Sequence, residues 1–252
     1  MQLLVSVKNV IEAADAVDAG VDILDIKDPS SGALGKADCR TITEIAGRYA
    51  QTVPVSIALG ELNDVEANGL ITTDWQFAKD IGFAKLGLSH ARSDQSLERL
   101  ENFLGSMPPG ISPVIVAYAD HELCGSPKPE RLLEWFQSTD DSLSSRIRYF
   151  LFDTYTKNPG SNLFSFLTVE RLQQLNNKIH RLNLQCVLAG SLTLNELPNV
   201  FRVGSDVLGV RGCVCKKGSR VETISAKQIV VLKDAINETD PYDQPNERKF
   251  AS

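Results

Sequence analysis

The residues best suited to chemistry in this chain are Asp25 and Lys27, which stand two positions apart at the end of an apolar run. A proline, Pro29, stops the run two residues later. Side chains alternate between the two faces of a strand, so Asp25 and Lys27 are expected on one face. A carboxylate and an amine are costly to bury there unless they pair or take part in a reaction. They therefore form either a structural ion pair or part of an active site.

A second set of charged residues could supply the partners that such a site needs. Asp153 directly follows another apolar run, and Lys157 lies four residues further on, close enough to fold back. Lys85 lies inside an apolar run of its own. Lysine is a nucleophile only when neutral, and both burial and neighbouring cations favour the neutral form. The set suits imine formation with a carbonyl substrate, although a strand-end lysine can also be a solvated rim residue.

Two glycine-containing segments late in the chain suggest an anion site. They are Leu188-Ala189-Gly190-Ser191 and Gly209-Val210-Arg211-Gly212. Glycine lets backbone N–H groups approach an anion, and barrel enzymes commonly bind phosphate on the loops after their last two strands. The candidate phosphate-binding residues are Gly190, Ser191, Arg211 and Gly212. The alternative is a pair of tight turns, and the following Lys216 and Lys217 are better explained as solvated loop residues.

The segments that carry these residues alternate between apolar strands and amphipathic helices. Strands are predicted at 2–7, 21–26, 53–59, 83–88, 113–118, 147–152, 185–189 and 207–210. Helices are predicted at 10–19, 38–50, 73–81, 94–107, 129–137, 167–182, 195–201 and 226–236, with a polar loop at 60–70. This order predicts an α/β fold, a (β/α)8 TIM barrel over residues 1–237, with a doubly wound open sheet as the alternative. A polar tail, 238–252, follows.

In such a barrel the chemistry lies at the C-terminal ends of the strands. Asp25, Lys27, Asp153 and Arg211 lie at or just after predicted strand ends, as does Asp120, whereas Lys85 lies within its strand and Lys157 in the loop after Asp153. We therefore expect Asp25, Lys27, Lys85, Asp153 and Lys157 to converge at the mouth of one catalytic domain.

The composition excludes several classes of function. A net charge of −6 and a pI of about 5.2 argue against a nucleic-acid partner. The five cysteines and three histidines have neither disulfide-framework nor metal-site spacing, so we expect no metal and no cofactor. We expect no signal peptide, and no apolar run comes near the ~20 residues of a membrane span. A cytoplasmic protein is expected, and whether it forms a homo-oligomer stays open.

Several motifs, in this order along residues 1–236, resemble the (5-formylfuran-3-yl)methyl phosphate synthases. They are LLVSVKN, DILDIKDPSSGALG, AKLGL, LFDTYTK, CVLAGS and LGVRGCVCKKG. That family makes the furan precursor of methanofuran-type C1 carriers. The chain departs from the archaeal pattern at Asp28, where those members tend to carry asparagine.

The resemblance implies a TIM-barrel lyase that condenses two glyceraldehyde 3-phosphate molecules, with loss of phosphate and water. It implies that Lys27 forms the Schiff base and that Lys85 accepts a proton. Asp25, Asp153 and Lys157 match the remaining active-site positions. The expected partner is thus a phosphorylated triose. Two alternatives remain: a class I aldolase-like or isomerase barrel acting on another phosphorylated sugar, and a non-catalytic barrel that binds a phosphorylated metabolite.

Overall fold

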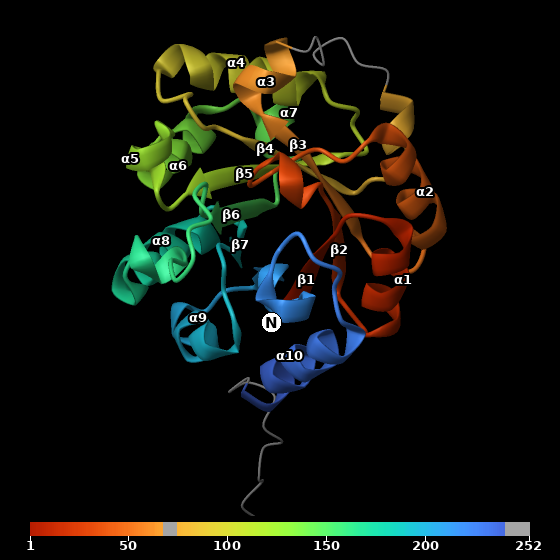
Figure 1. The fold of residues 1–252 in the computed structure, drawn as a ribbon. Coiled ribbons are helices and arrows are strands. Elements are labelled where there is room, and N and C mark those ends of the chain that lie inside the picture. The colour runs from red at the N-terminus through yellow and green to blue at the C-terminus, as the bar shows by residue number, and fades with distance from the viewer. Residues whose placement is uncertain (68–74, 240–252) are drawn as a thin grey trace, which may run out of the picture.

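A computed structural model describes residues 1–67 and 75–239 of the chain. Within these residues eight parallel strands close into a barrel in sequence order (Figure 1), and β8 pairs with β1. The strands are β1 (Gln2–Val7), β2 (Ile23–Ile26), β3 (Val55–Glu61), β4 (Phe83–Gly87), β5 (Ser112–Tyr118), β6 (Tyr149–Asp153), β7 (Gln185–Leu188) and β8 (Val207–Val210). The predicted TIM barrel is confirmed, and the open sheet is excluded.

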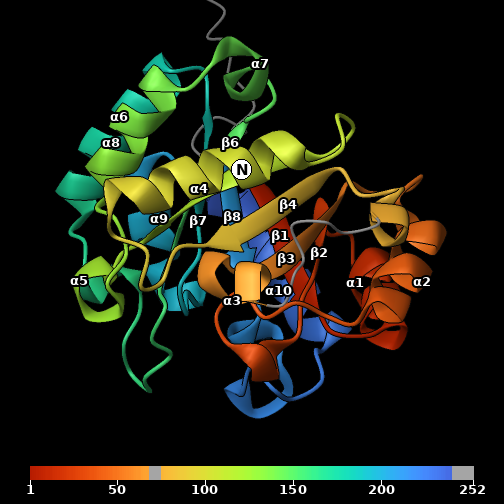
Figure 2. The same ribbon diagram turned by 90° about the horizontal axis from the view of Figure 1, so that it is seen from above.

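Helices surround the strands on the outside of the barrel. The α-helices are α1 (Val10–Asp18), α2 (Cys39–Tyr49), α3 (Leu62–Ala67), α4 (Asp94–Ser106), α5 (His121–Cys124), α6 (Pro129–Ser138), α7 (Asp141–Ser144), α8 (Val169–Arg181), α9 (Leu197–Val203) and α10 (Ala226–Thr239). Neighbouring helices pack together: α1 lies beside α2, and α6 beside α8, on opposite sides of the barrel (Figure 2). None of the helices in the described ranges is long and apolar enough to cross a membrane.

Side-chain oxygens cap the N-termini of several of these helices, at the points where the sequence changes from loop to apolar repeat. Asn9 accepts a hydrogen bond from the Glu12 N–H at the start of α1. Asp38 does the same for the Thr41 N–H in α2, and Thr168 for the Arg171 N–H in α8. Each bond satisfies an N–H group that a helix leaves without a partner at its first turn.

The alternation of side chains along the strands separates two apolar layers. In β5, Val114, Val116 and Tyr118 belong to the cluster inside the barrel, whereas Ile115 and Ala117 pack outward against the helices. The same alternation in β2 sends Leu24 and Ile26 outward, and it turns Asp25 and Lys27 into the interior. The strand period therefore decides which charged residues face the barrel lumen.

The structure departs from two predictions between β3 and β4. The predicted polar loop 60–70 is wrong at its start, because β3 runs to Glu61 and α3 follows, with Leu62 and Val65 buried one turn apart. The predicted helix 73–81 is replaced by a 3-10 turn, η3 (Trp75–Ala78). Trp75 stacks on Phe77 at 5.8 Å, and residues two apart do not face each other in an α-helix. Residues 68–74 lie outside the described ranges.

The other element boundaries differ from the predicted ones by a few residues. The last helix, α10, continues through Thr239, past the predicted domain end at 237. The rest of the predicted tail, residues 240–252, lies outside the described ranges. All five cysteines are free thiols.

Candidate active site

A cavity of about 390 Å³ lies within the barrel and is lined by side chains from all eight strands and from the loops that follow them. Its lining includes every residue that the sequence marks as a candidate: Asp25, Lys27, Lys85, Asp153, Lys157, Gly190, Ser191, Arg211 and Gly212. Asp120 is not among the lining residues. The convergence predicted from strand ends is thus found for five charged side chains and for both glycine-containing loops.

Asp25 is the centre of a buried polar network at one wall of this cavity. Its carboxylate accepts hydrogen bonds from Lys85 Nζ at 2.5 Å, Ser56 Oγ at 2.6 Å and Ser6 Oγ at 2.8 Å. Ser6 and Ser56 are the register partners of Asp25 on the two flanking strands, which explains why both hydroxyls reach it. Burial alone would raise the pKa of Asp25, but Lys85 and Lys27 outweigh burial and hold it below its ordinary value.

The ion pair that the sequence suggested between Asp25 and Lys27 is therefore not the one that forms. Asp25 pairs with Lys85, which comes from β4 and is 4% exposed. Alternation along β2 correctly predicts that Asp25 and Lys27 share a face. This alternation does not reveal Lys85 as the partner, because Lys85 lies on β4 and comes near Asp25 only through the pairing of β2 and β4 with β3.

A second carboxylate–lysine pair closes the opposite side of the cavity. Lys157 folds back from the loop after β6 and donates to Asp153 at 2.7 Å and to Thr154 Oγ1 at 3.2 Å. Burial would raise the pKa of Asp153, but Lys157 and Lys27 reverse that effect and lower it.

Asp120 holds the loop after β6 in place from outside the cavity. Its carboxylate accepts hydrogen bonds from the backbone N–H groups of Tyr155 at 2.7 Å and Thr156 at 2.8 Å, and from Thr156 Oγ1 at 2.6 Å. Asp120 is buried and does not reach the cavity. It holds the segment that carries Lys157, so its contribution to the site is indirect.

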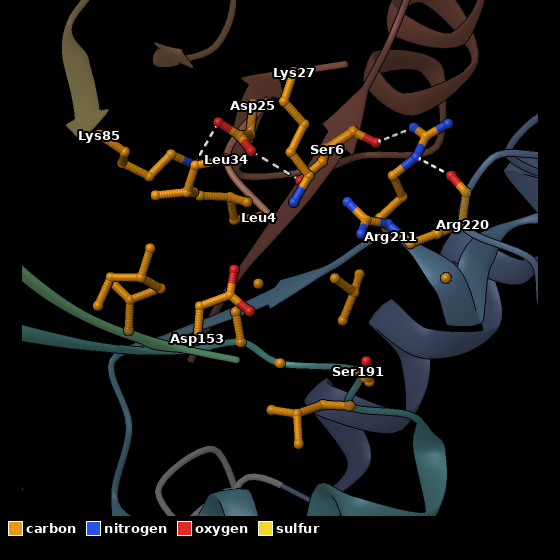
Figure 3. Close-up of a pocket in the computed structure, with 18 of the residues that line it drawn as sticks. Leu4, Ser6, Asp25, Lys27, Leu34, Lys85, Asp153, Ser191, Arg211 and Arg220 are labelled. Atoms are coloured by element: carbon orange, nitrogen blue, oxygen red, sulfur yellow. Dashed lines mark hydrogen bonds and ion pairs between the residues drawn. The ribbon is translucent and has the colours of Figure 1, made fainter. Parts of the chain in front are cut away.

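Lys27 lies between these two pairs and points into the cavity (Figure 3). Its Nζ has one long hydrogen bond, 3.5 Å to the Ala33 carbonyl, and no salt bridge within the described residues. Burial lowers the pKa of Lys27 to about 8, against the opposing effect of Asp153 and Asp25 and with help from Lys157 and Lys85. Because each carboxylate already has its own lysine, neither fully compensates a charge on Lys27. The amine is therefore close to half neutral near pH 8.

The loop that follows Lys27 is folded tightly over the amine. The Asp28 N–H donates to the Gly35 carbonyl at 2.8 Å and closes the loop. A Cβ at position 35 would collide with the Asp28 carbonyl oxygen, so only glycine fits this crossing. The Asp28 side chain caps a 3-10 turn, η1 (Pro29–Ser31), and accepts bonds from Ser30 and Ser31 instead of entering the cavity.

The two predicted anion-binding loops do line one end of the cavity. Gly190 and Ser191 both have positive φ, 100° and 57°, in the turn after β7. A β-carbon at Gly190 would come within 3.2 Å of the Thr154 backbone nitrogen, so a larger residue would crowd the loop that carries Lys157. Gly212 follows β8 and begins a short 3-10 turn, η6 (Gly212–Val214).

Arg211 lines the same end, but its guanidinium is turned away into protein contacts. It forms an ion pair of 2.9 Å with Glu12, a helix residue that is fully buried. The remaining N–H groups reach the carbonyl oxygens of Ser6 at 2.8 Å, Arg220 at 2.5 Å and Glu222 at 3.2 Å. Arg211 thus links β1, α1 and the loop after β8.

Arg220 is a lining residue that sequence reasoning missed. It lies in a loop without periodicity, eight residues after Gly212, and no neighbouring motif marks it. Its Nη2 donates to the Gly32 carbonyl at 2.7 Å. Ser6 and Ser56 were missed as well, although a lone serine inside an apolar strand is a detectable signal. Neither His90 nor His121 lines the cavity, and His180 pairs with Asp206 on the outer surface.

Comparisons with known proteins show the family of this chain and agree with its barrel fold. The model of the 4-HFC-P synthase family matches residues 3–233. A (5-formylfuran-3-yl)methyl phosphate synthase of Methanococcus maripaludis strain C5 is 30% identical over 234 residues, which cover 91% of this chain and 96% of that protein. A protein of the same name from Methanosarcina barkeri strain Fusaro is 28% identical, covering 92% and 97%.

Solved structures share the fold at low identity. Phosphoribosyl anthranilate isomerase from Thermotoga maritima superposes with a TM-score of 0.64 at 14% identity, covering 94% of this chain and 99% of that one. A 3-hexulose-6-phosphate synthase gives a TM-score of 0.56 at 14% identity, covering 92% and 99%. These likenesses concern the barrel alone. The family match spans nearly the whole described barrel, and the chain belongs to the 4-HFC-P synthase family, the (5-formylfuran-3-yl)methyl phosphate synthases, which are enzymes.

Proposed function

We propose that this enzyme condenses two glyceraldehyde 3-phosphate molecules through an imine on Lys27, with loss of phosphate and water, to give (5-formylfuran-3-yl)methyl phosphate. The observation that carries the proposal is an amine with a pKa of about 8 inside a cavity, between two carboxylates that already have lysine partners. The names of the relatives supply the product.

The first bond forms between Lys27 and the aldehyde carbon of one substrate molecule. Neutral Nζ adds to that carbon to give a carbinolamine, which loses water to give an iminium ion. The iminium makes the adjacent carbon acidic. A base removes its proton, and the resulting enamine carbon attacks the aldehyde of the second molecule.

We assign the proton transfers on this side of the cavity to Lys85. Its ammonium donates the proton with which the carbinolamine hydroxyl leaves as water, and the amine that results then takes the proton from the acidified carbon. Asp25 orients Lys85, because its other two contacts, from Ser6 and Ser56, fix the carboxylate in place.

Asp153 and Lys157 serve the opposite side. Asp153 lies near enough to Lys27 to oppose the effect of burial on its pKa, so the same charge would stabilise the iminium. Lys157, which is bound to Asp153, is the proposed acid for the departing phosphate. The phosphate that is retained binds to the backbone at Gly190, Ser191 and Gly212, with Arg211 holding that end of the barrel together.

Product analysis tests the proposal. The purified enzyme is incubated with glyceraldehyde 3-phosphate, and the product is identified by its near-ultraviolet absorbance and by mass spectrometry. We expect a furan aldehyde phosphate with the native enzyme and none with Lys27→Ala. A different sugar phosphate as product would favour an aldolase-like or isomerase reaction. Binding of the substrate without any product would favour a non-catalytic barrel.

A further inference from the structure

A cation that is free to bind would stabilise the phosphate proposed at the Gly190 and Gly212 end of the cavity. Arg211 was the sequence candidate, but all five of its N–H groups are used: Nε by Arg220 O, and the terminal nitrogens by Ser6 O, Glu222 O and both oxygens of Glu12. Its charge is matched by that of Glu12. A phosphate could recruit Arg211 only by breaking a buried ion pair, which is strongly unfavourable.

Arg220 has the properties that Arg211 lacks. It lines the cavity on the side opposite Lys85, close to Arg211 (Figure 3). Its Cβ lies 4.0 Å from the position that a β-carbon on Gly212 would take, so it stands beside the glycine loop. Within the described ranges its guanidinium makes one hydrogen bond, to the Gly32 carbonyl, and no salt bridge. The other N–H groups remain available for a ligand.

The electrostatics at Arg220 are those of an anion site. The side chain is partly buried, and burial lowers its pKa, with Asp153 as the main opposing influence. Arg211 adds a second positive charge nearby, which also lowers it. A partly buried guanidinium without its own carboxylate gains most from a bound anion, and its fork geometry matches phosphate oxygens.

We propose that Arg220 is the cationic ligand of the substrate phosphate held at Gly190, Ser191 and Gly212, and that it makes the enzyme select phosphorylated aldehydes over unphosphorylated ones. Arg211 is then a positioning residue, because its Nε holds the backbone carbonyl of Arg220. The identity of the substrate as a triose phosphate rests on the proposed function.

The contact with Gly32 also connects this site to Lys27. Arg220 is bound to the carbonyl of Gly32, and the next carbonyl along the chain, that of Ala33, accepts the hydrogen bond from Lys27 Nζ. One short loop therefore contacts both the reactive amine and the phosphate ligand. A small aldehyde with a phosphate at its other end would meet both groups at once.

The test compares one aldehyde with and without its phosphate. Lys27 is trapped with cyanoborohydride in the presence of glyceraldehyde 3-phosphate or glyceraldehyde, and the concentration dependence is measured for native enzyme, Arg220→Met and Arg220→Lys. The matched control is Lys216→Gln, which removes a positive charge from the same loop at an exposed position outside the cavity. Competition by inorganic phosphate is measured in parallel.

We expect Arg220→Met to weaken half-saturation by glyceraldehyde 3-phosphate and inhibition by phosphate about 10- to 100-fold, the usual range for loss of a hydrogen-bonded charge. Trapping of glyceraldehyde should change less than about threefold, and Arg220→Lys should lie between native enzyme and Arg220→Met. Lys216→Gln should match the native enzyme. If Arg220→Met does not fold, as judged by its melting curve, the test uses Arg220→Lys instead. The ratio of the half-saturating concentrations of glyceraldehyde 3-phosphate and glyceraldehyde in that variant then shows whether the phosphate preference has changed.

Equal losses for both aldehydes, or no change in phosphate preference in either variant, would overturn the proposal. Because the readout is trapping at Lys27, it does not require a furan product. An enzyme that made no furan but lost phosphate preference on mutation would refute the proposed function and leave the role of Arg220 standing. An enzyme that made furan and kept its phosphate preference on mutation would support the proposed function and refute the role of Arg220.

Discussion

The environment of Lys27 leads to opposite predictions for two neighbouring substitutions. With a pKa of about 8, roughly a quarter of Lys27 is neutral at about pH 7.5, against roughly one in a thousand for an ordinary lysine of pKa 10.5. Lys157→Met removes a cation and leaves Asp153 without its lysine partner. Asp153→Asn removes the carboxylate that most strongly opposes the effect of burial.

The direction of each pKa shift depends on whether the substitution stabilises the charged or the neutral form of the Lys27 amine. In Lys157→Met the unpaired carboxylate favours the charged amine, so the pKa of Lys27 should rise by about one to two units. The neutral fraction at about pH 7.5 should then fall by about one to nearly two orders of magnitude. In Asp153→Asn the neighbouring lysine cations act unopposed on that side, so the pKa should fall below 8 and the neutral fraction should increase a few-fold at most.

The assay is the rate of cyanoborohydride trapping of glyceraldehyde, followed from about pH 6 to about pH 10 by protein mass. This substrate has no phosphate, so the loops proposed to bind phosphate do not affect the measurement. The apparent midpoint of the pH profile reports the pKa of the free amine. Lys178→Met, which removes an exposed lysine from α8, serves as the matched control. Midpoints that move in the same direction in both variants, or in neither, would refute this account of the Lys27 environment.

Three further predictions concern the residues that hold the site together. Asp25→Asn should destabilise the fold by about 3–5 kcal/mol in a denaturant titration, because it leaves buried Lys85 without a counter-charge; a loss below ~1 kcal/mol would contradict this. Asp120→Asn should lower kcat about 10-fold or more while Lys27 trapping is retained, because it loosens the loop that carries Lys157; an unchanged kcat would count against the positioning role. Arg211→Met should unpair Glu12 and cost about 3–5 kcal/mol of stability, and in the folded fraction it should weaken the preference for phosphorylated aldehydes less than Arg220→Met does, because Arg211 acts only by holding the Arg220 carbonyl; a loss of preference as large as in Arg220→Met would contradict this.

The sequence predicts the strands of the barrel and most of the residues around its cavity for one physical reason. The alternation of side chains along a strand and the place where the strand ends are local properties. The alternation in β2 and the position of Asp153 at the end of β6 can therefore be read from the sequence itself. Parallel strands joined by helices then bring their C-terminal ends together. The cavity-lining positions of Lys27, Lys85 and Lys157 follow from those two facts.

The partners of these residues could not be predicted in the same way, because they depend on contacts between distant segments. Asp25 pairs with Lys85, sixty positions away, through the register of β2, β3 and β4. Arg211 is neutralised by Glu12 across the junction of β8 and β1, which no local pattern reveals. Arg220 reaches the cavity only because its loop folds back over the mouth.

The register of β1, β2 and β3 also indicates the role of Asp25. From the sequence alone, Asp25 could either pair with Lys27 or take part in the reaction. Ser6 and Ser56 bind its two oxygens, and Lys85 shares one of them. A carboxylate held by three donors, with its pKa lowered, is suited to orienting a lysine and poorly suited to accepting a proton. Proton transfer on this side of the cavity is therefore expected from Lys85.

The most direct test of the central claim is the location of the covalent adduct. The enzyme is reduced with borohydride in the presence of glyceraldehyde 3-phosphate, digested, and analysed by peptide mass spectrometry. We predict that the added mass lies on the peptide containing Lys27 and that Lys27→Ala abolishes it, while Lys85→Met and Lys157→Met retain some of it at high pH. An adduct on Lys85 or Lys157 in the native enzyme, or furan formation without any adduct on Lys27, would contradict the account.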